Sequence, residues 1–374
     1  MRNILFIVAV SGSLLAACNQ TGFTVNGTNE RVTEGKAYLI TLLNDFSKGD
    51  TIATSPIVEG AFTFTGKVEG VQPAMITFEG SQSAVRPIFL ENAVFAVNIG
   101  KSPSIEGRTV KAPGTPSSVT GGGPVQQVYS PYFDLQQAGG LKSNELQMAY
   151  FSTEDPAARD SIRQLLAQFQ QGLDAKEQEL IAANPDSYAT AFQVFIKSQQ
   201  DNLEQLKEKL GQLGENARAS NFGQLIAKRV QTLESVAIGQ VAPDFKLATP
   251  EGDTLSLHGI TAKVKLIDFW ASWCGPCRAE NPNVVAAYAE YHPKGLEILG
   301  VSLDSDRDKW IEAIAKDNLT WKHGSDLQFW SAAPAKLYGV NSIPHTLLLD
   351  AENRIIAKNL RGDALKAKLA ELLD

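Results

Sequence analysis

The segment Trp273-Cys274-Gly275-Pro276-Cys277 sets the tightest limit on what this chain folds into. It follows the apolar run 264–270 and precedes a stretch, Arg278 to about Tyr291, whose pattern predicts a helix. A helix N-terminus presents unpaired N–H groups and partial positive charge, which favour a thiolate over a thiol. Two cysteines where a buried strand feeds a helix are therefore predicted to form a reactive pair.

Two other roles are compatible with such a pair, a structural disulfide or half of a zinc site. Zinc needs further Cys or His ligands at suitable spacing. The third cysteine is the distant Cys18, and the histidines are scattered singly at His258, His292, His323 and His345. We therefore predict no metal and no cofactor beyond the redox-active disulfide Cys274–Cys277.

The N-terminus has the pattern of a signal peptide. Arg2 is followed by an apolar stretch, Ile4 to Ala17, that is short for a membrane span. The run Leu14-Leu15-Ala16-Ala17-Cys18 resembles the lipobox of bacterial lipoproteins. That resemblance implies lipidation of Cys18 and an anchor in a cell-envelope membrane, inner or outer. An ordinary secretory signal with an incidental cysteine is the alternative, and either one exports the chain to the periplasmic side.

Composition narrows the class of protein. The net charge of −7 and pI near 5.3 argue against a nucleic-acid-binding surface. The 374 residues suffice for two or three domains, and 43% hydrophobic with 20% charged residues is typical of globular chains. With no structural disulfide predicted, the fold must depend on ordinary hydrophobic cores.

The local patterns divide the chain into four parts. Short β-branched and aromatic runs between Phe23 and Ala112 predict a small antiparallel sandwich or barrel-like domain. A Gly/Pro/Ser/Thr-rich piece, made of the runs 112–118 and 121–124, is interpreted as a loop or linker. Apolar residues then recur at helical spacing up to Val236, with a break at Asn184–Ser187. The predicted parts are a signal peptide (1–18), a β-rich domain (19–120), a linker and helical connector (121–236) and an α/β redox domain (237–374).

The last part alternates predicted strands and helices. A hairpin at 245–257 precedes strands at 264–270 and 296–303, each followed by a helix. A helical stretch at 329–338, strands at 346–350 and 354–358 and a final helix at 364–373 complete the pattern. Parallel strands joined by helices and closed by an antiparallel hairpin predict a central mixed sheet flanked by helices.

The run from Ile267 to Arg278 closely resembles the active-site signature of thioredoxins. The segments 241–245 and 277–282, and the insertion before Pro344, are similar to the extracytoplasmic TlpA/ResA branch of that family. The whole layout resembles the lipoprotein members of this branch that are common in Bacteroidota. The resemblance implies a C-terminal thioredoxin fold, and it is specific from Gly239 onward.

The resemblance also implies roles for the residues of the pair and for the acid beside it. Cys274 is expected to be the exposed thiol that attacks a substrate disulfide, and Cys277 the thiol that resolves the mixed disulfide. Gly275 and Pro276 shape the turn, where Pro in the first helical turn costs no hydrogen bond. Asp268 matches the buried acid of thioredoxins, which exchanges a proton with the second cysteine. A structural carboxylate is the alternative for Asp268.

Further matched positions surround the pair. Glu280 matches an acid that tunes the thiols in ResA-like proteins, with an ordinary helix-surface residue as the alternative. Pro344 aligns with the cis-proline loop that faces the disulfide, which leaves the Ile343 backbone to pair with a substrate strand. Trp273 and Trp270 are expected to provide packing and docking surface.

These features predict an extracytoplasmic thiol–disulfide oxidoreductase that works as a reductase on protein thiol and disulfide substrates. Cytochrome c maturation and the reduction of secreted-protein disulfides are the substrates that the family implies. A membrane electron donor is expected, because the chain has no second CxxC pair. The alternatives are a thiol oxidant or disulfide isomerase, and a lipoprotein binding module that uses the thioredoxin fold as a scaffold. Ile267 and Ala271 stand where a peroxiredoxin has Pro and Thr, which argues against a peroxidase.

Overall fold

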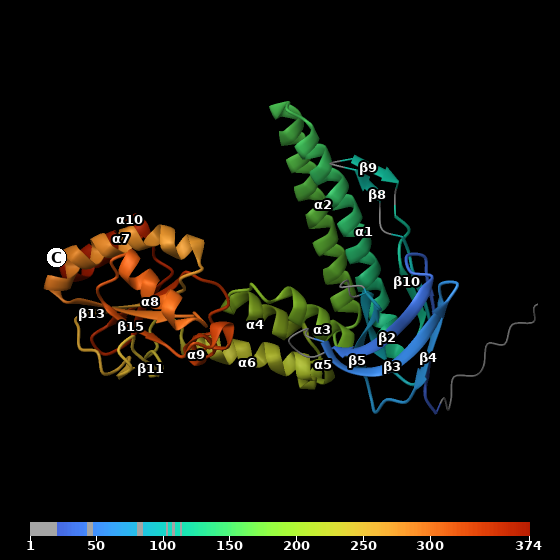
Figure 1. Cartoon of the computed structure of the whole chain (residues 1–374), viewed down its shortest axis with the longest axis horizontal. Coiled ribbons are helices and arrows are strands. Elements are labelled where there is room, and N and C mark those ends of the chain that lie inside the picture. The colour runs from blue at the N-terminus through green and yellow to red at the C-terminus, as the bar shows by residue number, and fades with distance from the viewer. Residues whose placement is uncertain (1–20, 43–47, 81–84, 102–103, 107–108, 113) are drawn as a thin grey trace, which may run out of the picture. The chain divides into compact units, whose positions relative to one another are not determined.

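The structure is a computed structural model that describes residues 21–42, 48–80, 85–101, 104–106, 109–112 and 114–374. The predicted signal peptide and its lipidation site Cys18 lie outside these residues. The chain divides into two units, Met1–Ile196 with Gly211–Gly223, and Lys197–Leu210 with Gln224–Asp374 (Figure 1).

The first unit is built on an eight-stranded sheet with the order β10-β7-β1-β4-β3-β2-β5-β6. Alternating burial along β1 places Phe23 and Val25 in its core, as expected for a strand with one covered face. The pairing is antiparallel except between β1 and β7, which run parallel, so the fully antiparallel arrangement expected from the sequence is wrong at this pair. The strands are β1 (Phe23–Asn29), β2 (Glu34–Leu42), β3 (Lys48–Val58), β4 (Ala61–Gly66), β5 (Gln72–Phe78), β6 (Val85–Leu90), β7 (Val94–Ile99) and β10 (Ser118–Gly121), with β8 (Ser104–Glu106) and β9 (Thr109–Ala112) forming a separate pair.

The two turn-forming runs interpreted as a loop or linker, 112–118 and 121–124, flank strand β10, and the interpretation is wrong at Ser118 and Gly121, which belong to the strand. Strand β10 pairs antiparallel with β7, with Val119 opposite Val97. Val119 is buried and belongs to the core of the sheet. A single apolar residue in a strand of four residues, surrounded by turn formers, leaves no periodic pattern to detect.

The predicted helical segment is confirmed, and it begins at Pro124 directly after the turn formers. Ser187 caps the helix that follows the predicted break, since its Oγ accepts a hydrogen bond from the Ala189 N–H at 3.2 Å. Helix α1 contacts the sheet, because the Gln126 side chain accepts a hydrogen bond from the backbone N–H of Phe89 at 2.8 Å. The helices are α1 (Pro124–Ser152), α2 (Pro156–Ala183), α3 (Tyr188–Lys197), α4 (Leu203–Gln212), α5 (Glu215–Ala219) and α6 (Asn221–Ser235).

The second unit holds a seven-stranded sheet with the order β12-β11-β15-β14-β13-β16-β17. Strands β13, β14 and β15 are parallel, while β16 and β17 run antiparallel beside β13. This is the predicted mixed sheet, and helices α7 and α10 pack side by side (Figure 1). The strands are β11 (Lys246–Ala248), β12 (Thr254–Ser256), β13 (Val264–Trp270), β14 (Leu296–Ser302), β15 (Lys322–Ser325), β16 (His345–Asp350) and β17 (Ile355–Lys358).

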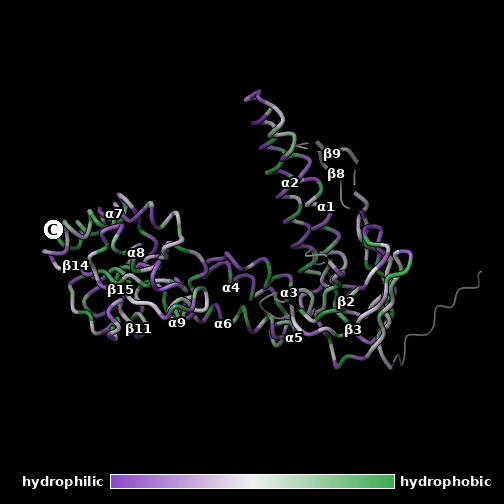
Figure 2. The backbone as a smooth tube through the Cα atoms, in the orientation of Figure 1, coloured by the Kyte–Doolittle hydropathy of each residue, from purple (hydrophilic) through white to green (hydrophobic). Residues whose placement is uncertain are grey.

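All residues of β13 are buried, as a strand covered on both faces by helices requires. Hydrophobic residues gather along the centre of this unit (Figure 2). Strand β15 was not predicted, and the helical stretch expected at 329–338 is interrupted at Ala332. The helices are α7 (Gly275–Tyr291), α8 (Arg307–Lys316), α9 (Ala333–Tyr338) and α10 (Gly362–Leu373), with short 3₁₀ turns η1 (His292–Lys294) and η2 (Phe329–Ser331). Within the described ranges, no helix is both long enough and apolar enough to span a membrane.

Candidate functional site

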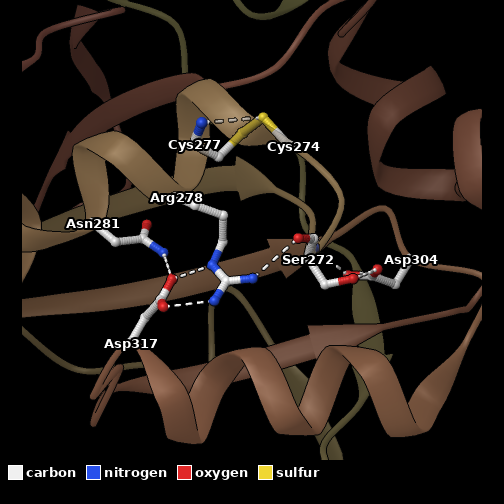
Figure 3. Close-up of polar contacts among 7 residues, drawn as sticks. All are labelled: Ser272, Cys274, Cys277, Arg278, Asn281, Asp304 and Asp317. Atoms are coloured by element: carbon white, nitrogen blue, oxygen red, sulfur yellow. Dashed lines mark hydrogen bonds and ion pairs between the residues drawn. A yellow bond between two sulfur atoms is a disulfide. The ribbon is translucent and has the colours of Figure 1, made fainter.

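Cys274 and Cys277 form a disulfide at the junction of β13 and α7 (Figure 3). Cys274 is the N-cap of α7, and its Sγ accepts a hydrogen bond from the Cys277 N–H at 3.2 Å. In this oxidised pair Cys274 is 5% exposed and Cys277 is 1% exposed. The order of exposure matches the prediction, but Cys274 is far less exposed than expected because it packs into the hydrophobic core of the unit.

The local sequence explains why the helix begins here. Pro276 lies in the first turn of α7, where its missing N–H leaves no hydrogen bond unmade. Gly275 is exposed, and a Cβ added to it would meet no atom within 4 Å. The two residues therefore form an exposed first turn of α7 between the two cysteines.

An ion pair holds the first turn of α7 against the C-terminal end of α8 (Figure 3). The guanidinium of Arg278 binds both carboxylate oxygens of Asp317, which caps the C-terminus of α8. It also donates to the Ser272 carbonyl at 3.1 Å, and Asn281 donates to Asp317 at 2.6 Å. The hydrogen bond from Arg278 holds the pKa of Asp317 below its usual range. One arginine thus ties the helix to the loop that enters it.

The same loop is held from its other side by Asp304, which is 1% exposed. Its carboxylate accepts hydrogen bonds from the Ser272 N–H at 2.9 Å and from the Ser272 hydroxyl (Figure 3). It also accepts one from the Ser302 hydroxyl at 2.8 Å. A buried carboxylate is stable only when such donors compensate its lost hydration. The sequence analysis missed Asp304 and Asp317, because nothing in their local patterns relates them to the cysteines.

Asp268 lies on β13 and is 5% exposed. Burial, and to a lesser extent the nearby Glu280 carboxylate, raise the pKa of Asp268 to about 7, and the positive charge of Arg361 opposes both. Asp268 lines a small cavity together with Cys277, Glu280, Pro344 and Arg361. The structure therefore brings the predicted acid, the second cysteine and the proline loop to one place.

Glu280 is half-buried and is engaged at both oxygens. It accepts hydrogen bonds from the Gly362 N–H at 2.7 Å and from the Asn283 side chain at 3.0 Å. The Ile343–Pro344 bond is cis, as predicted for the loop facing the pair, and Arg361 donates to the Pro344 carbonyl at 2.5 Å. Arg361 was also missed from the sequence.

Three exposed aromatic rings cluster around Trp273, the residue that precedes Cys274. Trp273 is 46% exposed, and its ring centroid lies 5.1 Å from that of Phe329 and 6.0 Å from that of Trp330. Phe329 and Trp330 are 43% and 38% exposed. Trp270, which the sequence grouped with Trp273, is buried in the core instead. Among the residues that the structure describes, no group of three or more His, Cys, Asp or Glu side chains is arranged to hold a metal.

The sheet order and a CxxC disulfide at the start of a helix define a thioredoxin-like dithiol site. A family model described as Redoxin matches residues 237–373, and a domain of unknown function, DUF4369, matches residues 23–129. The chain is 32% identical over 145 residues to thiol-disulfide oxidoreductase ResA of Bacillus thuringiensis, covering 37% of this chain and 79% of that one. It is 35% identical over 139 residues to the thioredoxin-like protein YneN of Bacillus subtilis, covering 36% and 78%.

Two solved structures are also similar in sequence to part of this chain. The C-terminal domain of a putative thiol-disulfide oxidoreductase from Bacteroides thetaiotaomicron is 34% identical, with a TM-score of 0.36, and covers 37% of this chain and 97% of that one. A thiol-disulfide oxidoreductase from Bacteroides fragilis is 37% identical, with a TM-score of 0.34, and covers 36% and 100%. On the similarity to ResA, this chain belongs to the TlpA/ResA-type thioredoxin-like thiol–disulfide oxidoreductases.

The raised pKa of Asp268 predicts how stability depends on pH. Between its ordinary value of 3.8 and about 7 the native state binds more protons than the unfolded state, so stability falls as pH rises through that window. Asp268→Asn removes this loss. The free energy of unfolding of the variant relative to that of wild type should therefore rise by up to about 4 kcal/mol from pH 4 to pH 8.

Urea unfolding followed by tryptophan fluorescence measures this difference, since all 5 tryptophans lie in the second unit. Replacing the exposed Asp253 by Asn is the matched control and should leave the pH dependence of wild type unchanged. Parallel pH profiles for wild type and Asp268→Asn would show that Asp268 does not titrate as described.

Proposed function

We propose that this protein is an extracytoplasmic thiol–disulfide reductase whose Cys274–Cys277 pair reduces disulfides in other proteins. The observation that carries this proposal is the disulfide at the start of α7 beside a buried acid, Asp268. A structural disulfide needs neither a helix N-terminus nor a proton acceptor, whereas thiol–disulfide exchange uses both.

In the first step the reduced Cys274 thiolate attacks one sulfur of the substrate disulfide. A mixed disulfide forms between Cys274 and the substrate, and the other substrate sulfur leaves as a thiolate. The N-terminus of α7 stabilises negative charge on Cys274, and the Cys277 N–H already points at its Sγ. Both cysteines are buried in the oxidised pair, and Cys274 is the more exposed residue of the two, which suits it to make the attack.

In the second step Cys277 resolves the mixed disulfide. Its thiol gives the proton to the Asp268 carboxylate, and its sulfur then attacks Cys274. The Cys274–Cys277 disulfide forms, and the second substrate sulfur leaves as a thiolate. A pKa of Asp268 near 7 suits this exchange, because both protonation states are then populated at neutral pH.

The cis-proline loop is proposed to hold the substrate chain. The antiparallel ladder between β13 and β16 ends at His345, so Ile343 and Pro344 lie just beyond it. An extended substrate segment would pair with the Ile343 backbone and bring its disulfide to Cys274.

The supply of electrons and the location of the protein form a further part of the proposal. The chain contains 3 cysteines and therefore no second pair to relay electrons, so another protein, a membrane electron donor, must reduce the disulfide. The lipobox pattern supports lipidation of Cys18 and an anchor on the periplasmic side of a membrane. Disulfides of secreted proteins, including those of apocytochromes c, are the proposed substrates. We also propose that residues 237–374 act as the redox domain, with 19–120 and 121–236 as the β-rich domain and helical connector.

Cysteine variants test the reaction directly. Cys274→Ser should lower the rate of insulin disulfide reduction by at least about 100-fold, because the attacking thiolate is lost. Cys277→Ser should instead accumulate a mixed disulfide between Cys274 and the substrate, visible by non-reducing electrophoresis and mass spectrometry. Cys18→Ser is the matched control and should retain wild-type activity in solution. Wild-type activity in Cys274→Ser would refute the proposed reaction.

We propose that Trp273, with Phe329 and Trp330, is the docking surface for the protein substrate. All three rings are exposed. Trp273 directly precedes Cys274, and the rings of Phe329 and Trp330 contact the ring of Trp273. Large aromatic side chains contribute much of the binding energy in protein interfaces.

Replacing Trp330 by Ala should therefore lower kcat/KM for insulin by about five- to tenfold, which corresponds to ~1 kcal/mol or more. The rate with a small aromatic disulfide should change less than about twofold, since that reagent needs only Cys274. Leu372→Ala, which truncates an equally exposed side chain on α10, is the control. An equal loss with both disulfides would assign Trp330 to the shape of the site and not to docking.

A further inference from the structure

The segment between β17 and α10 joins the two sides of the redox site. Arg361 donates a hydrogen bond to the Pro344 carbonyl at 2.5 Å, on the cis-proline side. The next residue, Gly362, donates its N–H to Glu280 on α7 at 2.7 Å. Gly362 has a φ of 48°, in the left-handed region that favours glycine. Two adjacent residues thus contact both elements that surround the disulfide.

The titratable groups that line the cavity with Asp268 come from α7 and from the start of α10. Glu280 and Cys277 face it from α7, and Arg361 faces it from the start of α10. The neighbouring positions in the sheet are uncharged, Gly300 on β14 and Thr346 on β16.

Two basic groups lie further along the same strands. His345 precedes Thr346 on β16, and burial lowers its pKa to about 4, so the ring is neutral near pH 7. The positive charge of Lys358 on β17 also lowers the pKa of His345. Burial lowers the pKa of Lys358 itself. Among these groups, Arg361 is therefore the cation whose charge lowers the pKa of Asp268.

We propose that Arg361 is a positioning residue of the redox site: it holds the Pro344 carbonyl in place and sets a positive charge against Asp268. One side chain then couples the loop that faces the substrate to the acid that takes the proton of Cys277. The role of that proton transfer rests on the proposed reductase function, whereas the contact between Arg361 and the acid does not.

The sign of the effect follows from the charge. A cation near a carboxylate stabilises its ionised form, so Arg361 lowers the pKa of Asp268 against the effect of burial. Removing the charge leaves less Asp268 carboxylate at neutral pH, and Cys277 then loses its proton only at higher pH. Arg361 as a whole is exposed, so water screens its charge and the expected shift is modest.

Two substitutions isolate the contribution of the charge, because both keep a hydrogen-bond donor at this position. Arg361→Gln keeps a donor for the Pro344 carbonyl but removes the charge, whereas Arg361→Lys keeps the charge. Arg354→Gln, at the residue before β17, is the control, because Arg354 is exposed and does not line the cavity. Glu280→Gln, which removes a negative charge, should act in the opposite direction to Arg361→Gln.

The direct test is an NMR titration of the oxidised full-length protein labelled with ¹³C at the aspartate carboxyl carbon. The Asp268 signal is assigned by its absence in Asp268→Asn. Its midpoint, near 7 in wild type, should rise by about half a unit or more in Arg361→Gln and fall in Glu280→Gln. Arg361→Lys and Arg354→Gln should stay within about 0.2 units of wild type. An unchanged midpoint in Arg361→Gln, or an equal change in Arg361→Lys, would overturn the proposal.

The second readout is the pH profile of insulin reduction by the same proteins. Arg361→Gln should be about threefold slower than wild type below pH 7 and should approach it near pH 9, as a half-unit shift requires. A uniform loss at every pH, with an unshifted Asp268 midpoint, would make Arg361 a structural tether only. If wild type itself reduces no disulfide while the midpoint still shifts, the reductase function fails and the coupling of Arg361 to Asp268 stands.

Discussion

The redox site depends on holding the N-terminus of α7 against the end of β13. Strand β13 is fully buried, so its end has a fixed position in the core. Arg278 binds the Ser272 carbonyl and Asp317, and Asp304 binds the N–H and hydroxyl of the same serine (Figure 3). The loop between strand and helix is thereby held through both its donor and acceptor groups. This rigidity keeps the N–H groups of the helix aimed at Cys274, where negative charge develops.

A second constraint is the burial of Asp268 behind the disulfide. A carboxyl in this position is neutral or charged depending on small changes in its surroundings, because burial brings its pKa near neutral pH. Glu280 and Arg361 provide opposing charges on the two sides of the cavity. In the proposed reaction, Asp268 would exchange a proton with Cys277 beside it, and Cys274, the more exposed residue of the pair, would react with the substrate.

How far the sequence predicts this structure depends on the range of the interactions. The bounds of β13 were predicted correctly because a continuous apolar run before a CxxC motif is a strong local signal. Strand β15 was missed because Lys322-His323-Gly324-Ser325 has no apolar residue or alternation to mark it. Asp304 and Asp317 were missed because they bind residues 32 and 39 positions earlier in the chain, through contacts that only the tertiary fold creates. Arg361 was missed for the same reason, since it lies 93 residues after Asp268.

The measurement that tests the account most directly is the reduction potential of the Cys274–Cys277 pair, obtained by equilibrating the protein with defined dithiol buffers. A thiolate held by a helix N-terminus beside a proton acceptor occurs in both reductants and oxidants, and the potential separates them. The reductase account predicts a value near or below about −250 mV, close to that of thioredoxin. A value between about −180 and −120 mV would contradict it and would make the protein an oxidant or isomerase.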